Sequence, residues 1–302
     1  MKIKSIREGF LPYEVLHDIA TRNPDLLSSH IGELIQVKWR KKERLMFYAE
    51  AFSGYIKRAV SIINGEQFHQ DEDKYLNKLP TISLGGELLT RCHDRYLPQK
   101  YIGDAFRKMP KEMMAEVSAI ILRQQLKEIQ VFPKNKRYSV NVENVYEYPN
   151  AWKETIRVIS EYATTSISLE LIEDSMFSPR ALDDIADACQ RTGAGIYIDD
   201  LCSLCHSLPD SQEYVVMLIE KLHEHMRAVK IDFSVMQNIL IDIDAANEVG
   251  NNLRSFRWLW IGHCDAPVPA VIFESMPKRD INWLRELELF ARGYKCCYYQ
   301  LG

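Results

Sequence analysis

Four polar residues recur along the chain at nearly constant intervals. Subtraction of their residue numbers separates Asn141, Glu170, Asp199 and Lys230 by 29, 29 and 31 residues. Each lies at or near the end of a short apolar run, and about 30 residues is the length of one strand–helix unit. The four side chains therefore keep the same phase in successive units. In a barrel of such units, that phase places them on the rim at the carboxyl ends of the strands, where active sites of this architecture are built.

Most residues of this candidate rim are carboxylates. Carboxylates that converge in one pocket repel each other unless cations neutralise them, and ligand sets made only of oxygen suit hard divalent ions such as Mg²⁺ or Mn²⁺. The adjacent Asp199 and Asp200 could each direct a carboxylate to one of two ions, an arrangement used for in-line attack on phosphate esters. The alternative is that some of these residues are ordinary polar residues of a barrel rim or helix N-caps. The full set comprises Glu87, Asn141, Glu170, Asp199, Asp200, Lys230 and Glu274.

The elements that would position these side chains alternate between two patterns. Short apolar runs that predict buried strands are separated by amphipathic segments that predict helices. Strand–helix alternation of this kind indicates a parallel sheet with helices outside it. The strand candidates are residues 137–142, 166–173, 195–200, 228–232 and 269–275, and the clearest helix candidates are 152–163, 181–193 and 214–226.

The first part of the chain has a different character. Residues 11–22 and 30–52 carry apolar residues at three- and four-residue spacing, which predicts helices. A polar and acidic stretch at 65–77 is interpreted as a surface loop. We therefore expect a helical extension over residues 1–56, followed by the barrel domain over 57–302.

Composition narrows the class of protein. The formal net charge is −4, with 46% apolar and 26% charged residues, which is typical of a soluble globular protein. No basic block is long enough to indicate binding to a nucleic-acid polymer. The densest basic run, at 37–45, is interpreted as a solvated helix face rather than as a phosphate-binding patch.

The sequence contains no recognisable targeting signal, and together with its cysteines this predicts a cytoplasmic protein. No stretch approaches the ~20 apolar residues of a membrane span, and the N-terminus lacks the apolar core of a signal peptide. The seven cysteines are odd in number and irregularly spaced, unlike a secreted disulfide framework, so we expect reduced thiols.

Six short segments, in order, resemble the motifs of the EAL-domain family. Their order and spacing agree over about residues 82–300, and the segment at 98–109 also fits. The signature differs at Leu88, where the family usually has alanine. The segments are GELLTR (86–91) for EAL-L-x-R, YSVNV (138–142) for S-V-N-L, LELIE (169–173) for L-E-L-T-E, IDD (198–200) for the start of D-D-F-G-T-G, VKID (229–232) for L-K-I-D and FES (273–275) for A-E-G.

The resemblance implies a TIM-like (β/α)₈ barrel of EAL type that hydrolyses cyclic di-GMP to pGpG with Mg²⁺ or Mn²⁺. It implies that Lys230 contacts the nucleophilic water or the phosphate, that Arg91 contacts a phosphate of the nucleotide, and that Glu173 stabilises the loop after the paired aspartates. For the metals, it implies that Glu87, Asn141, Glu170 and Asp199 ligate the first ion, that Asp200 ligates the second, and that Glu274 lies beside the second ion.

The loop after the paired aspartates departs from the family. It reads DDLCSLCHSL (199–208), with Cys202 and Leu204 where the family has glycines. If those positions require a positive φ, both residues would be strained, so we expect a weakly held second ion and an altered dimer contact. Pro277 also stands where the family has a second glutamate. The family's closing glutamine has its nearest counterpart in Gln300.

Two other motifs have alternative interpretations. Cys202, Cys205 and His206 form C-x-x-C-H, which could belong to a zinc site, a redox pair or plain buried thiols. The thiol interpretation is favoured, because no second pair with the spacing of zinc ligands accompanies the motif. The adjacent Cys296 and Cys297 are interpreted as packing residues, and the aromatic residues of 257–263 are interpreted as core.

Two functions remain open at this point. A metal-dependent phosphodiesterase is favoured, because all the implied ligands of the first metal and Lys230 are present. The alternative is a catalytically inactive barrel that acts as a cyclic di-GMP receptor or binds a protein. The divergent loop supports it, because catalysis requires tighter geometry than binding does. A homodimer or a regulatory protein partner is compatible with both.

Overall fold

This computed structural model describes residues 12–37, 81–95, 97–172, 176–201, 211–232, 243–276 and 293–301. Within them, eight strands follow one another in hydrogen-bonded order and close into a barrel. The predicted α/β class and TIM-like barrel are therefore confirmed. The strands are β1 (Leu27–Val37), β2 (Thr81–Cys92), β3 (Arg137–Val142), β4 (Ile167–Leu171), β5 (Gly195–Ile198), β6 (Met226–Ile231), β7 (Ala270–Met276) and β8 (Cys297–Leu301).

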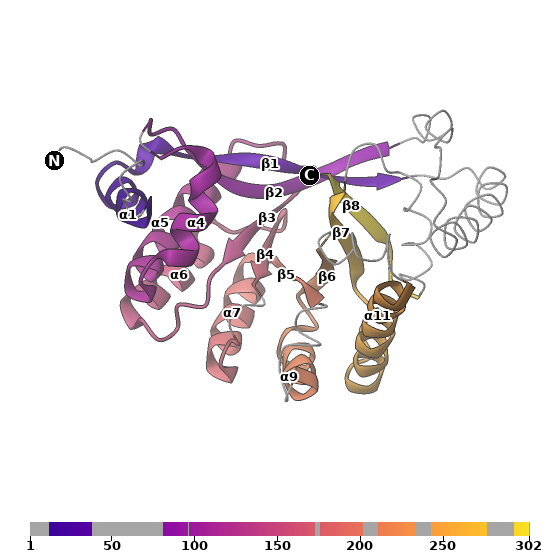
Figure 1. Cartoon of the computed structure of the whole chain (residues 1–302). Coiled ribbons are helices and arrows are strands. Elements are labelled where there is room, and N and C mark those ends of the chain that lie inside the picture. The colour runs from indigo at the N-terminus through magenta and orange to yellow at the C-terminus, as the bar shows by residue number, and fades with distance from the viewer. Residues whose placement is uncertain are drawn as a thin grey trace, which may run out of the picture. The chain divides into compact units, whose positions relative to one another are not determined.

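The chain forms two compact units, of which the first comprises residues 1–32 and 86–197. Figure 1 shows its strands β3 to β5 alternating with helices, as the sequence predicts. β3 and β4 pair in parallel, and this register sets Asn141 opposite Glu170. Its helices are α1 (Pro12–Arg22), α4 (Ile102–Lys108), α5 (Lys111–Ile129), α6 (Pro149–Tyr162) and α7 (Pro179–Thr192), with short 3₁₀ turns η2 (Pro24–Leu26) and η3 (Gln99–Tyr101).

Helix α7 shows how local chemistry sets an element's bounds. The hydroxyl of Ser178 caps its start by accepting a hydrogen bond from the Ala181 N–H, and Pro179 occupies the first turn, where its missing N–H costs nothing. Gly193 ends the helix with φ +72°, a conformation that favours glycine. A Cβ there would also lie 2.7 Å from Thr165 Cγ2.

Helix α1 is anchored to the first unit by an apolar cluster. Leu16, Ile19, Leu97, Ala105 and Val117 are all buried in it, and α1 packs against α4 and α5. Burial of a leucine, isoleucine or valine side chain stabilises by roughly 1.5–3 kcal/mol. The predicted helix at 11–22 is therefore confirmed over the residues of α1.

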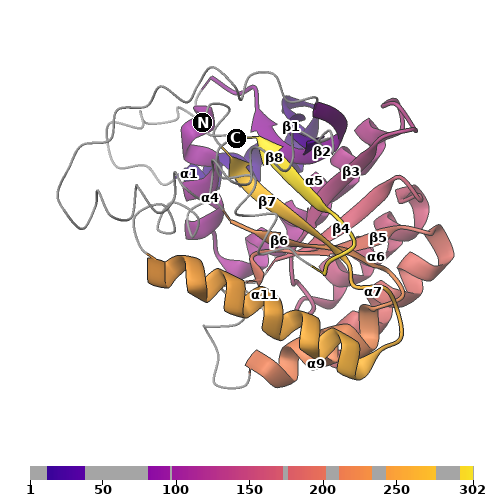
Figure 2. The ribbon, with the colours of Figure 1, turned by 90° about the vertical axis from the view of Figure 1, so that its right-hand side faces the viewer.

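The second unit comprises residues 33–85 and 198–302. β6 pairs with β7 and β7 with β8 in parallel, whereas β1 runs antiparallel to β8, with Leu34 opposite Gln300. Its helices α9 (Ser211–Leu222) and α11 (Ile243–His263) contact one another, and they lie side by side in Figure 2.

One prediction from the helical spacing is corrected. The helix expected over 30–52 is wrong for residues 30–37, which belong to β1, because pairing with β8 overrides a spacing that also fits a helix. The barrel thus takes a strand from the part of the chain assigned to the extension. The rest of that segment, the basic run beyond residue 37 and the acidic stretch at 65–77 lie outside the described residues.

The aromatic segment at the end of α11 is only partly core. Trp260 is buried, as predicted, whereas Trp258 is 74% and Ile261 54% exposed. The prediction for the aromatic residues is therefore wrong for Trp258, which lies with Ile261 on another face of the helix. In the part of the chain that the structure describes, no helix is long and apolar enough to cross a membrane.

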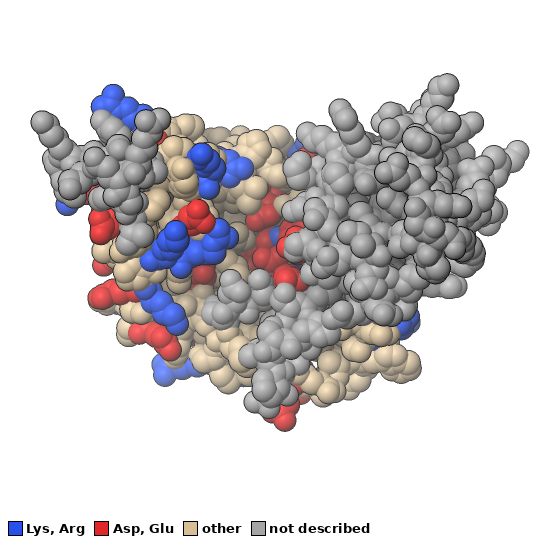
Figure 3. Space-filling view, in the orientation of Figure 1, with Lys and Arg blue, Asp and Glu red and all other residues tan. Residues whose placement is uncertain are grey.

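On the face that Figure 3 shows, charged side chains of both signs are interspersed among the described residues. Arg22 pairs with Asp18 along α1, and Arg107 pairs with Asp104 along α4. Exposed pairs of this kind stabilise by at most about 1 kcal/mol.

Candidate functional site

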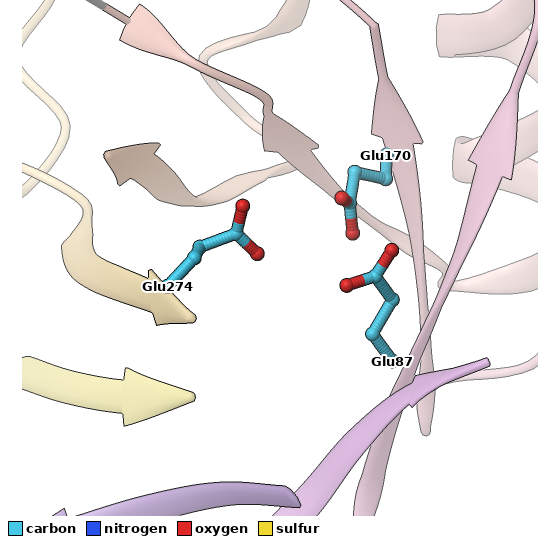
Figure 4. Close-up of side chains that lie close together, drawn as sticks. All are labelled: Glu87, Glu170 and Glu274. Carbon is cyan, nitrogen blue, oxygen red and sulfur yellow. The ribbon is translucent and has the colours of Figure 1, made fainter. Parts of the chain in front are cut away.

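In the first unit, three predicted metal ligands meet on neighbouring strands: Asn141 and Glu170 lie near the carboxyl ends of β3 and β4, and Glu87 lies in the middle of β2. Glu87 is 7% exposed and Glu170 is fully buried, and oxygens of the two carboxylates lie within 4.8 Å of one another. Figure 4 shows them turned toward each other from β2 and β4. Asn141 in β3 donates a hydrogen bond from Nδ2 to Glu87 Oε1 at 3.4 Å.

The register of the strands explains this meeting. Asn141 and Glu170 are partners across β3 and β4, so their side chains point to the same face of the sheet. The flanking residues point to the opposite face, and Val140 and Leu169, for example, are fully buried there. The alternation of the two strands therefore places Asn141 and Glu170 side by side on one face of the sheet.

These residues fit a divalent metal ion. Two carboxylates brought this close repel each other unless a cation or a proton intervenes. The Oδ1 atom of Asn141 is buried and has no hydrogen-bond partner among the described residues. A buried oxygen without a partner is costly, and a hard cation ligated by oxygen would satisfy it.

A cavity of about 550 Å³ adjoins these residues within the first unit. Arg91 and Asn141 both line it, together with Gln99, Phe106 and Gln125. Because Arg91 follows Glu87 by four residues in β2, the two side chains share one face of the strand. The guanidinium of Arg91 donates to the Thr90 carbonyl at 3.0 Å, and the cavity supplies room for an anion beside it.

The Cys92 thiol at the end of β2 stays protonated at neutral pH. Burial raises the pKa of Cys92 above its ordinary value, and the nearby Asp94 carboxylate acts in the same direction. The Asp94 N–H, which donates to Cys92 Sγ at 3.4 Å, opposes them. The five cysteines among the described residues are all free thiols.

In the second unit, a buried lysine is surrounded by carboxylates. Lys230 in β6 is 1% exposed. Its Nζ forms an ion pair with Glu274 of β7 and lies 3.5 Å from Asp199 Oδ1. Glu274, also drawn in Figure 4, is 12% exposed and Asp199 21%. A buried ammonium persists only when it is paired in this way.

The paired aspartates follow β5 with an unusual backbone. Asp200 has φ +29°, in the left-handed region that aspartate tolerates better than most residues. Its N–H donates to Asp199 Oδ1 at 3.1 Å, the same oxygen that faces Lys230. Cys202 and Leu204, where we expect strain if the backbone requires a positive φ, lie outside the described residues.

Within the first unit, Glu87, Asn141 and Glu170 lie together, with Arg91 in the adjoining cavity. Within the second unit, Asp199, Lys230 and Glu274 lie together. Gln300 lies in β8 and is 8% exposed. The remaining predictions, which concern Glu173, Cys202, Leu204, Cys205, His206 and Pro277, lie outside the described residues.

Sequence reasoning missed two glutamines of the cavity wall. Gln99 and Gln125 both hydrogen-bond to the backbone of β2. Gln125 sits in an amphipathic helix, where a glutamine is a common solvated residue. Its 5% exposure is the signal that marks it, and the sequence does not contain that signal.

A scan against models of protein families gives no match, and a search among curated protein sequences gives none either. Solved structures do match. The PaMucR phosphodiesterase in complex with c-di-GMP is 14% identical, with a TM-score of 0.55 over 95% of this chain and 94% of that one. The identity is too low to compare individual side chains.

Two further structures match over 56% of their own length. The Bacillus subtilis YkuI protein, with an EAL domain, in complex with substrate c-di-GMP and calcium, is 14% identical, with a TM-score of 0.56 over 95% of this chain. Vibrio cholerae LapD (S helix-GGDEF-EAL, bound to c-di-GMP) is 11% identical, with a TM-score of 0.58 over 96%. The chain thus spans little more than half of either protein. Together with the closed barrel, these likenesses confirm the predicted resemblance at the level of the fold: the chain is a divergent protein with the EAL-type (β/α)₈ barrel.

Proposed function

We propose that this protein hydrolyses cyclic di-GMP to pGpG in the cytoplasm with Mg²⁺ or Mn²⁺. The observation that carries the proposal is the buried Glu87–Asn141–Glu170 group with its unpartnered Asn141 oxygen. An all-oxygen group of this kind has little structural use without a cation. The neighbouring Arg91 and its cavity offer a place for a phosphate.

The proposed reaction uses two metal ions. Glu87, Asn141, Glu170 and Asp199 ligate the first ion, and Asp200 ligates the second, beside Glu274. Lys230 orients the attacking water or the phosphate through its buried ammonium, and Glu173 stabilises the loop after the aspartates. A divalent ion supplies charge stabilisation and a more acidic bound water. The support is that the carboxyl ends of parallel barrel strands share one rim.

The second candidate is an inactive receptor for cyclic di-GMP, alone, as a homodimer or with a regulatory protein. The backbone of Asp200 favours it, because φ +29° directs its carboxylate differently from a residue in extended conformation. A displaced ligand would weaken the second ion and slow the reaction, while Arg91 would still reach a phosphate.

Incubation of the pure protein with cyclic di-GMP and Mn²⁺, followed by chromatography of the nucleotides, tests the proposal. We expect pGpG to appear, and Glu87→Gln to abolish it. Glu112→Gln is the matched control, because Glu112 is an exposed glutamate in the first turn of α5. Binding measured by calorimetry without any pGpG would favour the receptor. Neither binding nor hydrolysis would refute both functions.

A further inference from the structure

The end of β2 has a glutamine side chain where a barrel strand usually has a neighbouring strand. Gln99 Nε2 donates to the Thr90 carbonyl at 3.1 Å, and Gln99 Oε1 accepts from the Cys92 N–H at 3.2 Å. The carbonyl of one residue and the N–H two residues later lie on the same edge of a strand. The carboxamide of Gln99 therefore pairs with this edge as a peptide group of an adjacent strand would.

A second glutamine binds the backbone of the same strand two residues earlier. Gln125 of α5 donates from Nε2 to the Leu88 carbonyl at 2.8 Å and lies 3.4 Å from Thr90 Oγ1. Gln125 is 5% exposed, so its carboxamide cannot exchange these partners for water without cost. The two glutamines approach β2 from separate elements, because Gln99 begins η3.

The backbone groups that they bind alternate with the two charged side chains of this strand. Leu88 follows Glu87, and Thr90 precedes Arg91. The Thr90 carbonyl accepts from Gln99 and also from the Arg91 guanidinium. Both glutamines and Arg91 line the same cavity. A shift of the peptide groups at 88–92 would therefore move the carboxylate and the guanidinium together.

We propose that Gln99 and Gln125 are positioning residues that fix the end of β2, so that Arg91 meets a ligand phosphate and Glu87 meets a metal ion in one geometry. The roles of Arg91 and Glu87 rest on the proposed function. The glutamines act through these residues rather than on the reacting atoms. Geometry held to well under 1 Å is what such a site requires.

Gln99→Met is the first test, because methionine keeps the length of the side chain and removes both hydrogen bonds. We expect the KM for cyclic di-GMP, and its Kd in Ca²⁺, to rise about tenfold, as loss of two hydrogen bonds implies. The kcat should fall by less than KM rises, because the peptide groups that Gln99 binds adjoin Arg91 rather than Glu87. Gln125→Met should mainly lower kcat, because it frees the peptide group next to the metal ligand Glu87.

Gln130→Met is the matched control. Gln130 is exposed and also donates to two backbone carbonyls, those of Leu126 and Tyr162, but it lies away from β2. A purely structural role would lower the melting temperature of the Gln99 variant without changing KM. An unchanged KM and Kd in Gln99→Met, or an equal rise in the control, would overturn the proposal.

A readout without nucleotide separates this inference from the proposed function. The Cys92 amide should exchange its hydrogen faster in Gln99→Met, and Gln99→Glu should restore protection, because a carboxylate still accepts from that N–H. If exchange behaves in this way and the unmodified protein binds no cyclic di-GMP, the proposed function fails and the support of β2 by Gln99 stands. Unchanged exchange in Gln99→Met would refute that support directly.

Discussion

Substitution of the buried Lys230 should lower both the stability of the protein and its rate of hydrolysis, and a second substitution should restore only part of the stability. Lys230→Met deletes the partner of Glu274 and the cation 3.5 Å from Asp199. Loss of one partner of a buried ion pair costs about 3–5 kcal/mol. Because the two carboxylates keep 12% and 21% exposure, water solvates them in part, and we expect about 3 kcal/mol. For a chain of this size that lowers the melting temperature by on the order of 10 °C.

The double variant Lys230→Met, Glu274→Gln distinguishes the effect on stability from the effect on hydrolysis. It removes the charge that the single variant leaves unpaired, so part of the lost stability should return. Hydrolysis should not return, since loss of a group that orients the attacking water costs at least about a hundredfold. Urea unfolding of the four proteins without metal gives the coupling energy of the pair.

Two outcomes would refute this reasoning. If Lys230→Met is as stable as the unmodified protein, the ion pair contributes nothing to the folded state. If the double variant is no more stable than the single one, the loss comes from packing around the lysine stem rather than from unpaired charge. Either result would remove the electrostatic argument for the roles of Lys230, Glu274 and Asp199.

Three further predictions concern metal, the divergent loop and pH. Millimolar Mn²⁺ should raise the melting temperature by preferential binding to the folded state, an effect that Glu87→Gln should abolish and Glu112→Gln should keep; calorimetric scans check this. Cys202→Gly combined with Leu204→Gly should raise the rate of hydrolysis without changing nucleotide affinity, and a rate equal to that of the unmodified protein would contradict the loop argument. Burial lowers the pKa of His225 from its ordinary 6.5, so the unfolded chain binds the proton first and stability should fall as pH drops below about 6.5. In His225→Gln this part of the pH dependence should disappear from urea unfolding curves.

The sequence by itself determined the elements whose signals are local. The strand–helix alternation from β3 to β7 follows from short apolar runs and amphipathic spacing. Start and stop residues such as Ser178 and Gly193 set the bounds of α7 within a few residues. The register of β3 and β4 keeps Asn141 and Glu170 in phase, so the interval between the two residues was enough to predict that their side chains meet.

Only the tertiary structure decided the features that depend on distant partners. Residues 30–37 have helical spacing, yet they form a strand because β8 supplies its hydrogen-bonding edge some 260 residues away. The glutamine contacts to β2 and the exposure of Trp258 likewise depend on which elements pack together. A local pattern specifies what a segment can form, and long-range pairing selects among the possibilities because each segment buries its apolar face only against a neighbour.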